Sequence, residues 1–199
     1  MVKLYPTDVS QLSAAEVDRV RHNIAAAHLR AAQEFREAFA AQPLPATAYL
    51  EILANALIEE AAGVRLTGRG YTIADNVIAP LYENFDVDRT PAAIFEYWLI
   101  ISEIAGSASW RMTRVITTRE EYDDALRRMQ DLQIVRALVA SFLPAVEIRD
   151  DGTAMLQATV YTRAQEERVE RRTLFLDTSN EFHFHGRELI AEGRGGVRQ

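Results

Sequence analysis

The chain has 199 residues, of which 48% are hydrophobic and 26% charged, the profile of a globular protein of one domain. It contains no cysteine, which excludes disulfides, cysteine-ligated metal centres and cysteine nucleophiles. The 29 acidic and 22 basic side chains give a formal net charge of −7. A chain with this balance gains little from phosphate contacts, so nucleic acid and anionic membranes are disfavoured as partners.

The N-terminus has no apolar signal-peptide core, and no stretch of the sequence is long and apolar enough to cross a bilayer. These features predict a cytoplasmic protein without a membrane partner.

Two helices are expected first. Ser13 and Glu16 form a capping box, and apolar residues at helical spacing follow, which predicts a long helix over about 14–41. A second helix is expected over 46–62, because apolar residues recur there at the same spacing and Gly63 stands at its end.

The middle of the chain is less regular. Residues 64–70 fit a loop or a short strand, and the capping residues Thr72 and Asp75 indicate a short third helix. Thr90 followed by proline predicts the start of a further helix, apolar nearly all round, over about 91–104.

The last helix is expected after a segment, 110–117, that fits either a strand or a lead-in. Thr118 and Glu121 form a second capping box, and apolar spacing predicts a helix over 119–142. The helical part, residues 14–142, therefore holds about five helices.

From residue 145 the hydrophobic period changes to two. Asp151-Gly152 predicts a hairpin with a type I′ turn, and residues 178–180 predict another turn. The expected fold is α+β: helices followed by a four-stranded antiparallel meander packed on them. We expect a single domain over 1–199, made of a helical part, a sheet and a short tail, with the boundaries 1–144, 145–190 and 191–199.

One strand carries a group of metal-binding side chains. Glu181, His183 and His185 project to one face of an extended strand, and a turn at 178–180 brings Asp177 near them. The simpler alternative is an outer face without a metal, with the core formed by Leu174, Leu176, Phe182 and Phe184. We expect no metal and no cofactor, and keep Glu181, His183 and His185 as the candidate ligands.

A second group of residues is typical of a small-molecule pocket. Aromatic side chains gather in the middle of the chain beside acids, and the candidate ligand-binding residues are Tyr71, Tyr82, Tyr97, Trp98 and Trp110. Asp75, Asp86 and His183 are the candidates for a general base. Core packing explains the same aromatics, so both interpretations stay open.

The first expectation for function is a non-catalytic interaction or assembly protein, a homo-oligomer or an accessory subunit of a larger complex. Its partner would be itself or another protein subunit, contacted through the first helix, whose alanine-rich stripe permits close approach, and through the C-terminal tail. The alternative is a small-molecule-binding protein or metal-independent enzyme with a pocket between the sheet and the helices. No string of residues identifies a family.

Overall fold

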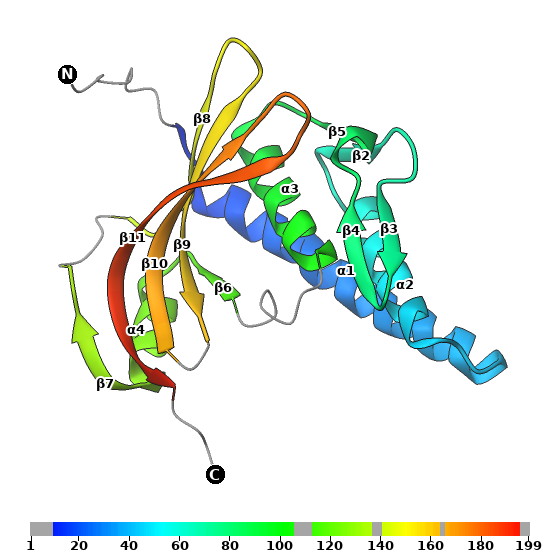
Figure 1. The fold of residues 1–199 in the computed structure, drawn as a ribbon, viewed down its shortest axis with the longest axis horizontal. Helices are drawn as coiled ribbons and strands as arrows, with labels where there is room; N and C mark the ends of the chain where they lie inside the picture. Colours follow the sequence, from blue (N-terminus) through cyan, green and yellow to red (C-terminus); the bar gives the residue numbers. More distant parts are fainter. Residues whose placement is uncertain (1–9, 106–112, 137–140, 164–165, 196–199) are drawn as a thin grey trace.

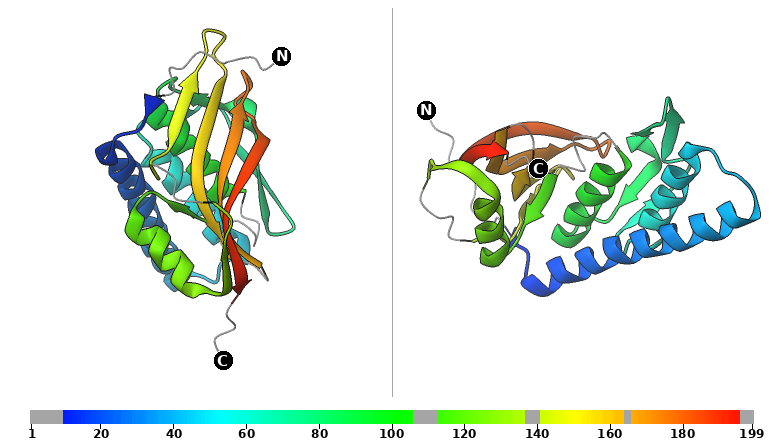
Figure 2. Two further views of the ribbon diagram at one scale, coloured as in Figure 1. Left: turned by 90° about the vertical axis from the view of Figure 1, so that its left-hand side faces the viewer. Right: turned by 90° about the horizontal axis from the view of Figure 1, so that it is seen from below.

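A computed structural model describes residues 10–105, 113–136, 141–163 and 166–195 (Figure 1). The fold is α+β, as expected: the described part holds four α-helices and a strongly curled antiparallel sheet that forms a half-barrel. The helical end of the molecule and the sheet lie side by side, and α1 runs along both (Figure 2).

Three helices begin where the sequence predicts. α1 spans Ala14–Ala41, and its capping box is present: the Ser13 hydroxyl accepts from the Glu16 amide, and the Glu16 carboxylate accepts from the Ser13 amide. α2 spans Ala46–Glu59 and α3 spans Pro91–Ile104, where the Thr90 hydroxyl accepts from the amide of Ala93. These local signals are therefore confirmed.

The expected short helix after Thr72 is wrong. The segment is a hairpin of β3 (Tyr71–Ala74) and β4 (Val77–Pro80), whose two turn residues, Asp75 and Asn76, have φ values of 49° and 62°. Two left-handed residues in succession make a tight hairpin turn, for which Asp and Asn are suited.

Two further short strands frame this hairpin. β2 (Val64–Leu66) pairs with β5 (Phe85–Val87), and a 3-10 turn at Tyr82–Asn84 precedes β5.

The helix expected over 119–142 ends early. α4 spans only Arg119–Arg128, and the chain continues as the strand β7, Met129–Ile134, so the described part has four α-helices where about five were expected. Residues 137–140 of the expected helix lie outside the described residues. Apolar residues at 129, 132 and 135 fit a helix, but pairing with β11 (Phe182–Gly195) satisfies the backbone of this segment as a strand.

The predicted meander is the centre of a larger sheet. Its four strands are β8 (Ala145–Ile148), β9 (Ala154–Thr162), β10 (Glu166–Leu176) and β11. The full sheet has seven strands in the order β1-β8-β9-β10-β11-β7, and β6 pairs with β9 beyond the end of β8. The added strands are β1 (Ser10–Gln11), β6 (Thr113–Ile116) and β7. They come from distant parts of the chain.

Both predicted hairpin turns exist, but the first is not type I′. At the β8–β9 turn only Gly152 has a positive φ, of 81°, and its amide donates to the carbonyl of Arg149. The β10–β11 turn has the same three-residue form, with Asn180 at φ 65° in the place of the glycine. Each turn therefore needs one left-handed residue and not two.

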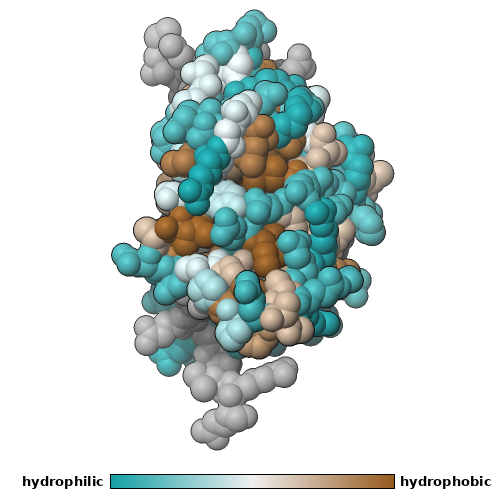
Figure 3. Space-filling view, turned by 90° about the vertical axis from the view of Figure 1, so that its right-hand side faces the viewer, coloured by the Kyte–Doolittle hydropathy of each residue, from teal (hydrophilic) through white to brown (hydrophobic). Residues whose placement is uncertain are grey.

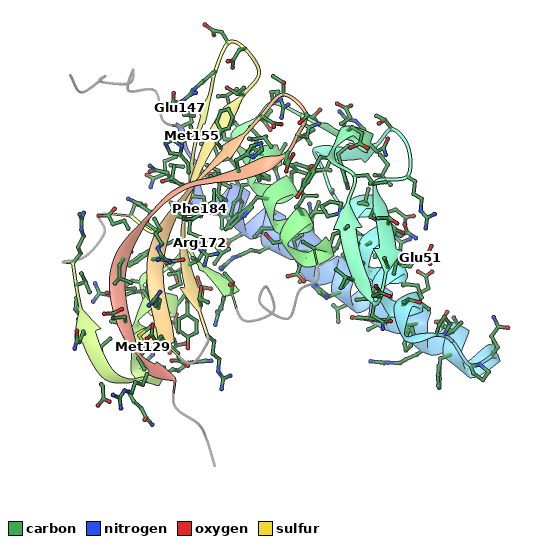
Figure 4. The ribbon with its side chains drawn as sticks, viewed as in Figure 1. Glu51, Met129, Glu147, Met155, Arg172 and Phe184 are labelled. Carbon is green, nitrogen blue, oxygen red and sulfur yellow. The ribbon has the colours of Figure 1, made fainter. Side chains whose placement is uncertain are left out.

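The two faces of the sheet contribute to different cores. The larger core joins α1, α2 and α3 to one face, through Val146, Ala154, Leu156, Ala158, Val160, Leu174 and Leu176. The smaller core lies under α4 on the other face, and its members are Ile116, Tyr122, Ala125, Met129, Phe142, Tyr161, Val169, Ile190 and Ala191. Met129 marks this core at the lower end of the sheet (Figure 4). β6, α4 and β7 form a crossover over this face.

A buried carboxylate links the helices. Glu96 of α3 is 1% exposed, and its two oxygens accept from the side chain of Asn23 at 2.7 Å and from the amides of Ala62 and Gly63 at 2.9 and 3.0 Å. It therefore satisfies backbone groups that follow α2 and connects them to α1 and α3.

Candidate functional site

The predicted histidine cluster forms in part, at the β10–β11 turn. The ligand atoms of Asp177, Glu181 and His183 lie within 4.8 Å of one another, and the His183 Nε2 atom is 2.7 Å from the Asp177 Oδ2 atom. Phe175 faces His183 across the strands, as predicted. A His and two carboxylates are metal ligands by type, but this group is exposed and its closest pair is already hydrogen-bonded.

His185 does not join this cluster. β11 has a bulge there: Thr173 pairs with Gly186 and Leu174 with Phe184, so His185 is the extra residue. Phe184, which is paired with Leu174 next to the bulge, is 62% exposed, whereas Leu174 is buried. The expected pairing of Thr173 with His185 is wrong, and Phe184 is not part of the core.

The turn that carries Asp177 is held against the helical end of the molecule. The backbone carbonyl of Asn180 accepts from the buried Tyr97 hydroxyl at 2.9 Å, and its side chain bonds Arg89 and the carbonyl of Phe85. Partial burial raises the pKa of Asp177, but hydrogen bonds from His183 and from Ser179 lower it to about 2. The hydrogen bond to Asp177 in turn raises the pKa of His183.

The candidate pocket residues do not converge. Tyr71 is buried and donates to Asn55, and Tyr97 is buried against Phe85 and Phe182. Tyr82 is half-buried nearby, and the buried Trp98 borders a separate hollow beside α1 and β6.

The two acids near these aromatic residues are either exposed on a turn or paired with an arginine. Asp75 is an exposed turn residue, and Asp86 is exposed and pairs with Arg65 at 3.5 Å. Trp110 lies outside the described residues. The described positions of Asp75 and Asp86 therefore do not support the prediction that one of them is a general base beside a bound substrate.

The sheet has an open edge that the sequence did not indicate. β7 is the last strand of the sheet, and no described strand pairs with its outer side. Three aliphatic side chains on or directly after it are exposed: Leu132 by 39%, Ile134 by 59% and Val135 by 52%. Edge strands are normally protected by charges or proline, but β7 has the single charge of Asp131. Because the sequence predicts a helix for this segment, it did not predict a sheet edge there.

The helical end of the molecule differs from this edge. There, hydrophobic residues form small separate patches bounded by hydrophilic ones (Figure 3). Such scattered exposure is usual for a protein surface, whereas adjacent exposed aliphatic residues on an unpaired strand are not.

The fold and these surfaces define an α+β protein with a curled antiparallel half-barrel whose last strand, β7, has no outer partner among the described strands. No family model, no curated protein and no solved structure matches the chain. Within the described ranges, no helix is long and apolar enough to span a membrane.

Proposed function

We propose that the chain is a non-catalytic assembly protein that pairs with a second copy of itself through the outer edge of β7. The observation that carries this proposal is the run of exposed aliphatic side chains at Leu132, Ile134 and Val135 on a strand without a described outer partner. An open edge of this kind is a template to which another strand adds by backbone hydrogen bonding.

The sequence of β7 is self-complementary in an antiparallel pairing. When a two-fold axis passes through Gln133, Leu132 of one copy lies opposite Ile134 of the other, and the same pair forms again across the axis. Asp131 has a left-handed φ of 49° at the register shift between β7 and β11, so the regular pairing is confined to residues 132–134. The register therefore sets Leu132 against Ile134 on both sides of the axis and sets no like charges in opposition.

The expected affinity is modest. Covering the exposed half of an aliphatic side chain contributes about 1 kcal/mol, so two from each copy contribute about 4 kcal/mol. Backbone hydrogen bonds add to this, and the loss of free motion on association opposes it by about 4 kcal/mol or more. The result is a dissociation constant in the micromolar range or weaker.

Sedimentation equilibrium over a range of concentrations tests this proposal. The wild-type chain should approach twice 22.4 kDa as concentration rises, and Ile134→Lys should remain monomeric at the same concentrations. Val77→Lys is the matched control, because Val77 is 49% exposed on β4, away from the sheet edge. A wild-type chain that stays monomeric, or equal effects of the two lysines, would contradict the proposal.

The contacts expected from the sequence remain secondary proposals. On α1, Leu29 is 75% and Phe39 55% exposed, so this helix offers additional apolar surface for a larger assembly. The last residues of the tail, 196–199, lie outside the described residues. The alternative function, binding of a small molecule, is favoured by one different observation, the cavity between α4 and the sheet.

A further inference from the structure

The cavity lies on the opposite edge of the sheet from β7. Its volume is about 380 Å³, which lies within the range of small-molecule pockets. Its lining residues come from β6 and β9 on one side and from α4 on the other. In the ribbon, α4 lies behind the lower half of β9 and β10 (Figure 1). On α4 the lining residues Glu121, Ala125 and Arg128 fall on one helical face.

The floor of the cavity is apolar with one polar atom. Ile116 and Ala125 are 1% and 4% exposed and belong to the smaller core. Tyr161 is 6% exposed, and its buried hydroxyl lies beside the carboxylate of Glu167, with no hydrogen bond of ordinary geometry to it or to another described group. Burial and the neighbouring carboxylate of Glu167 raise the pKa of Tyr161 to about 12, so the phenol keeps its proton and remains a donor.

The rim of the cavity carries three arginines: Arg114, Arg128 and Arg163. Arg128 makes no hydrogen bond or ion pair with a described residue. Within the described ranges, Arg163 has a single ion pair, with Glu167 at 3.8 Å. The guanidinium groups of Arg128 and Arg163 therefore retain donors for a ligand.

The acids on the rim already have partners. The carboxylate of Glu121 accepts two hydrogen bonds from Arg21, at 2.8 and 3.2 Å, and one from Arg114 at 3.1 Å. Asp124 pairs with Arg127 on the same helix. The buried carboxylate of Glu167, whose Oε2 atom has no hydrogen bond to a described group, lies beside the Tyr161 hydroxyl, so the positive charge at the cavity comes from the guanidinium groups of Arg128 and Arg163.

We propose that this cavity binds a small organic anion. Its carboxylate or phosphate oxygens pair with Arg128 and accept a hydrogen bond from the Tyr161 hydroxyl, and its apolar part covers Ile116 and Ala125. None of the residues that line the cavity belongs to β7, so the site does not use the edge strand of the proposed dimer.

Calorimetric titration at low salt with three probes that share a phenyl ring tests the chemistry. Phenyl phosphate and benzoate carry the two kinds of anion, and benzamide has the shape of benzoate without its charge. At least one anion should bind saturably and benzamide should not, and whichever anion binds more tightly identifies the preferred group. Binding of benzamide as tight as that of benzoate, or no saturable binding of either anion, would overturn the proposal.

Variants then locate the site. Arg128→Gln should weaken binding about tenfold or more, because a charge-assisted hydrogen bond is lost, and Tyr161→Phe should weaken it severalfold. The control is Arg119→Gln, which removes the same charge from α4 at a residue that pairs with Asp123 outside the cavity. Thermal unfolding of each variant shows that it is folded. The assignment would be contradicted if Arg119→Gln weakened binding as much as Arg128→Gln does, or if Arg128→Gln or Tyr161→Phe left binding unchanged. Binding of inorganic phosphate but of neither organic anion would also contradict it.

Discussion

One face of the sheet packs into a core shared with α1, α2 and α3, whereas the opposite face is covered by α4 over part of its length. The larger core contains fully buried residues such as Phe95, Ile100 and Leu156. The β6-α4-β7 crossover on the other face borders both the cavity and the open edge. We therefore expect the core on the first face to contribute most of the stability of the fold. Both proposed interactions involve the β6-α4-β7 crossover.

The largest expected effect distinguishes the two cores. Leu156→Ala, at a residue that is 0% exposed, should lower the free energy of unfolding by about 3 kcal/mol because it leaves a cavity. Leu126→Ala in the half-buried contact of α4 should cost only about 1 kcal/mol, because that site is partly open to water. Chemical denaturation at neutral pH measures both. Equal losses would mean that α4 is as firmly packed as the other helices.

The next largest effect on stability is expected at the ion pair that links α4 to α1. Glu121 of α4 binds Arg21 of α1 and the amide of Thr117. Burial raises the pKa of Glu121, but these hydrogen bonds and the nearby arginines lower it to about 2.

Since this folded-state pKa lies below the unfolded value, the carboxylate stabilises the fold fully above about pH 4.5, and this contribution is lost as the pH falls towards 2. Glu121→Gln should therefore cost about 2 kcal/mol at pH 7 and much less at pH 3. Denaturation of both proteins at the two pH values measures the difference. A deficit that does not change with pH would contradict the role of the ion pairs.

A smaller effect tests how β7 is held. A Cβ atom on Gly193 would lie 2.7 Å from the Gln130 carbonyl oxygen and 2.8 Å from the Met129 Cβ atom, so Gly193→Ala should displace β7 and cost about 1 kcal/mol. It should also weaken self-association without altering any exposed aliphatic side chain. Gly186→Ala on the same strand meets nothing within 4 Å and should be neutral. Equal behaviour of the two variants in denaturation and sedimentation would show that the β7 contact is loose.

The smallest effect is at the β10–β11 turn. The hydrogen bond to Asp177 raises the pKa of His183, so the pair stabilises the fold below the ordinary histidine pKa and loses this contribution as the pH rises through the folded value. His183→Ala should therefore lower the thermal midpoint slightly at pH 6 and less at pH 9. His185→Ala, at the bulge, should show no such dependence on pH.

Local signals in the sequence predicted much of this fold. The cap at Ser13, the proline after Thr90 and the Gly152 hairpin act over a few neighbouring residues, so they can be recognised without the rest of the chain. β7 could not be predicted this way, because its apolar spacing fits a helix and only pairing with β11 makes it a strand. The bulge at His185 likewise depends on the pairing with β10.

The site was predicted less well than the fold, for a related reason. The sequence indicated that Glu181 and His183 lie near Asp177, which a short turn determines. The cavity depends on Tyr161 and Arg128, which the crossover from β6 through α4 brings together. These residues are far apart in the sequence, so no local pattern predicts that they lie close together.

Disulfide trapping tests the central claim, self-pairing through β7, most directly. The chain has no cysteine, so a single introduced cysteine can form only an intermolecular disulfide. Gln133→Cys places two sulfurs at the proposed two-fold axis, at a Cα separation that allows a disulfide. Gln130→Cys, on the same exposed strand, lies beyond the bulge at Asp131 and far from its own counterpart in the second copy. Self-pairing through β7 predicts that Gln133→Cys, but not Gln130→Cys, forms covalent dimers under mild oxidation. Equal trapping of the two variants, or trapping of neither, would contradict self-pairing through β7.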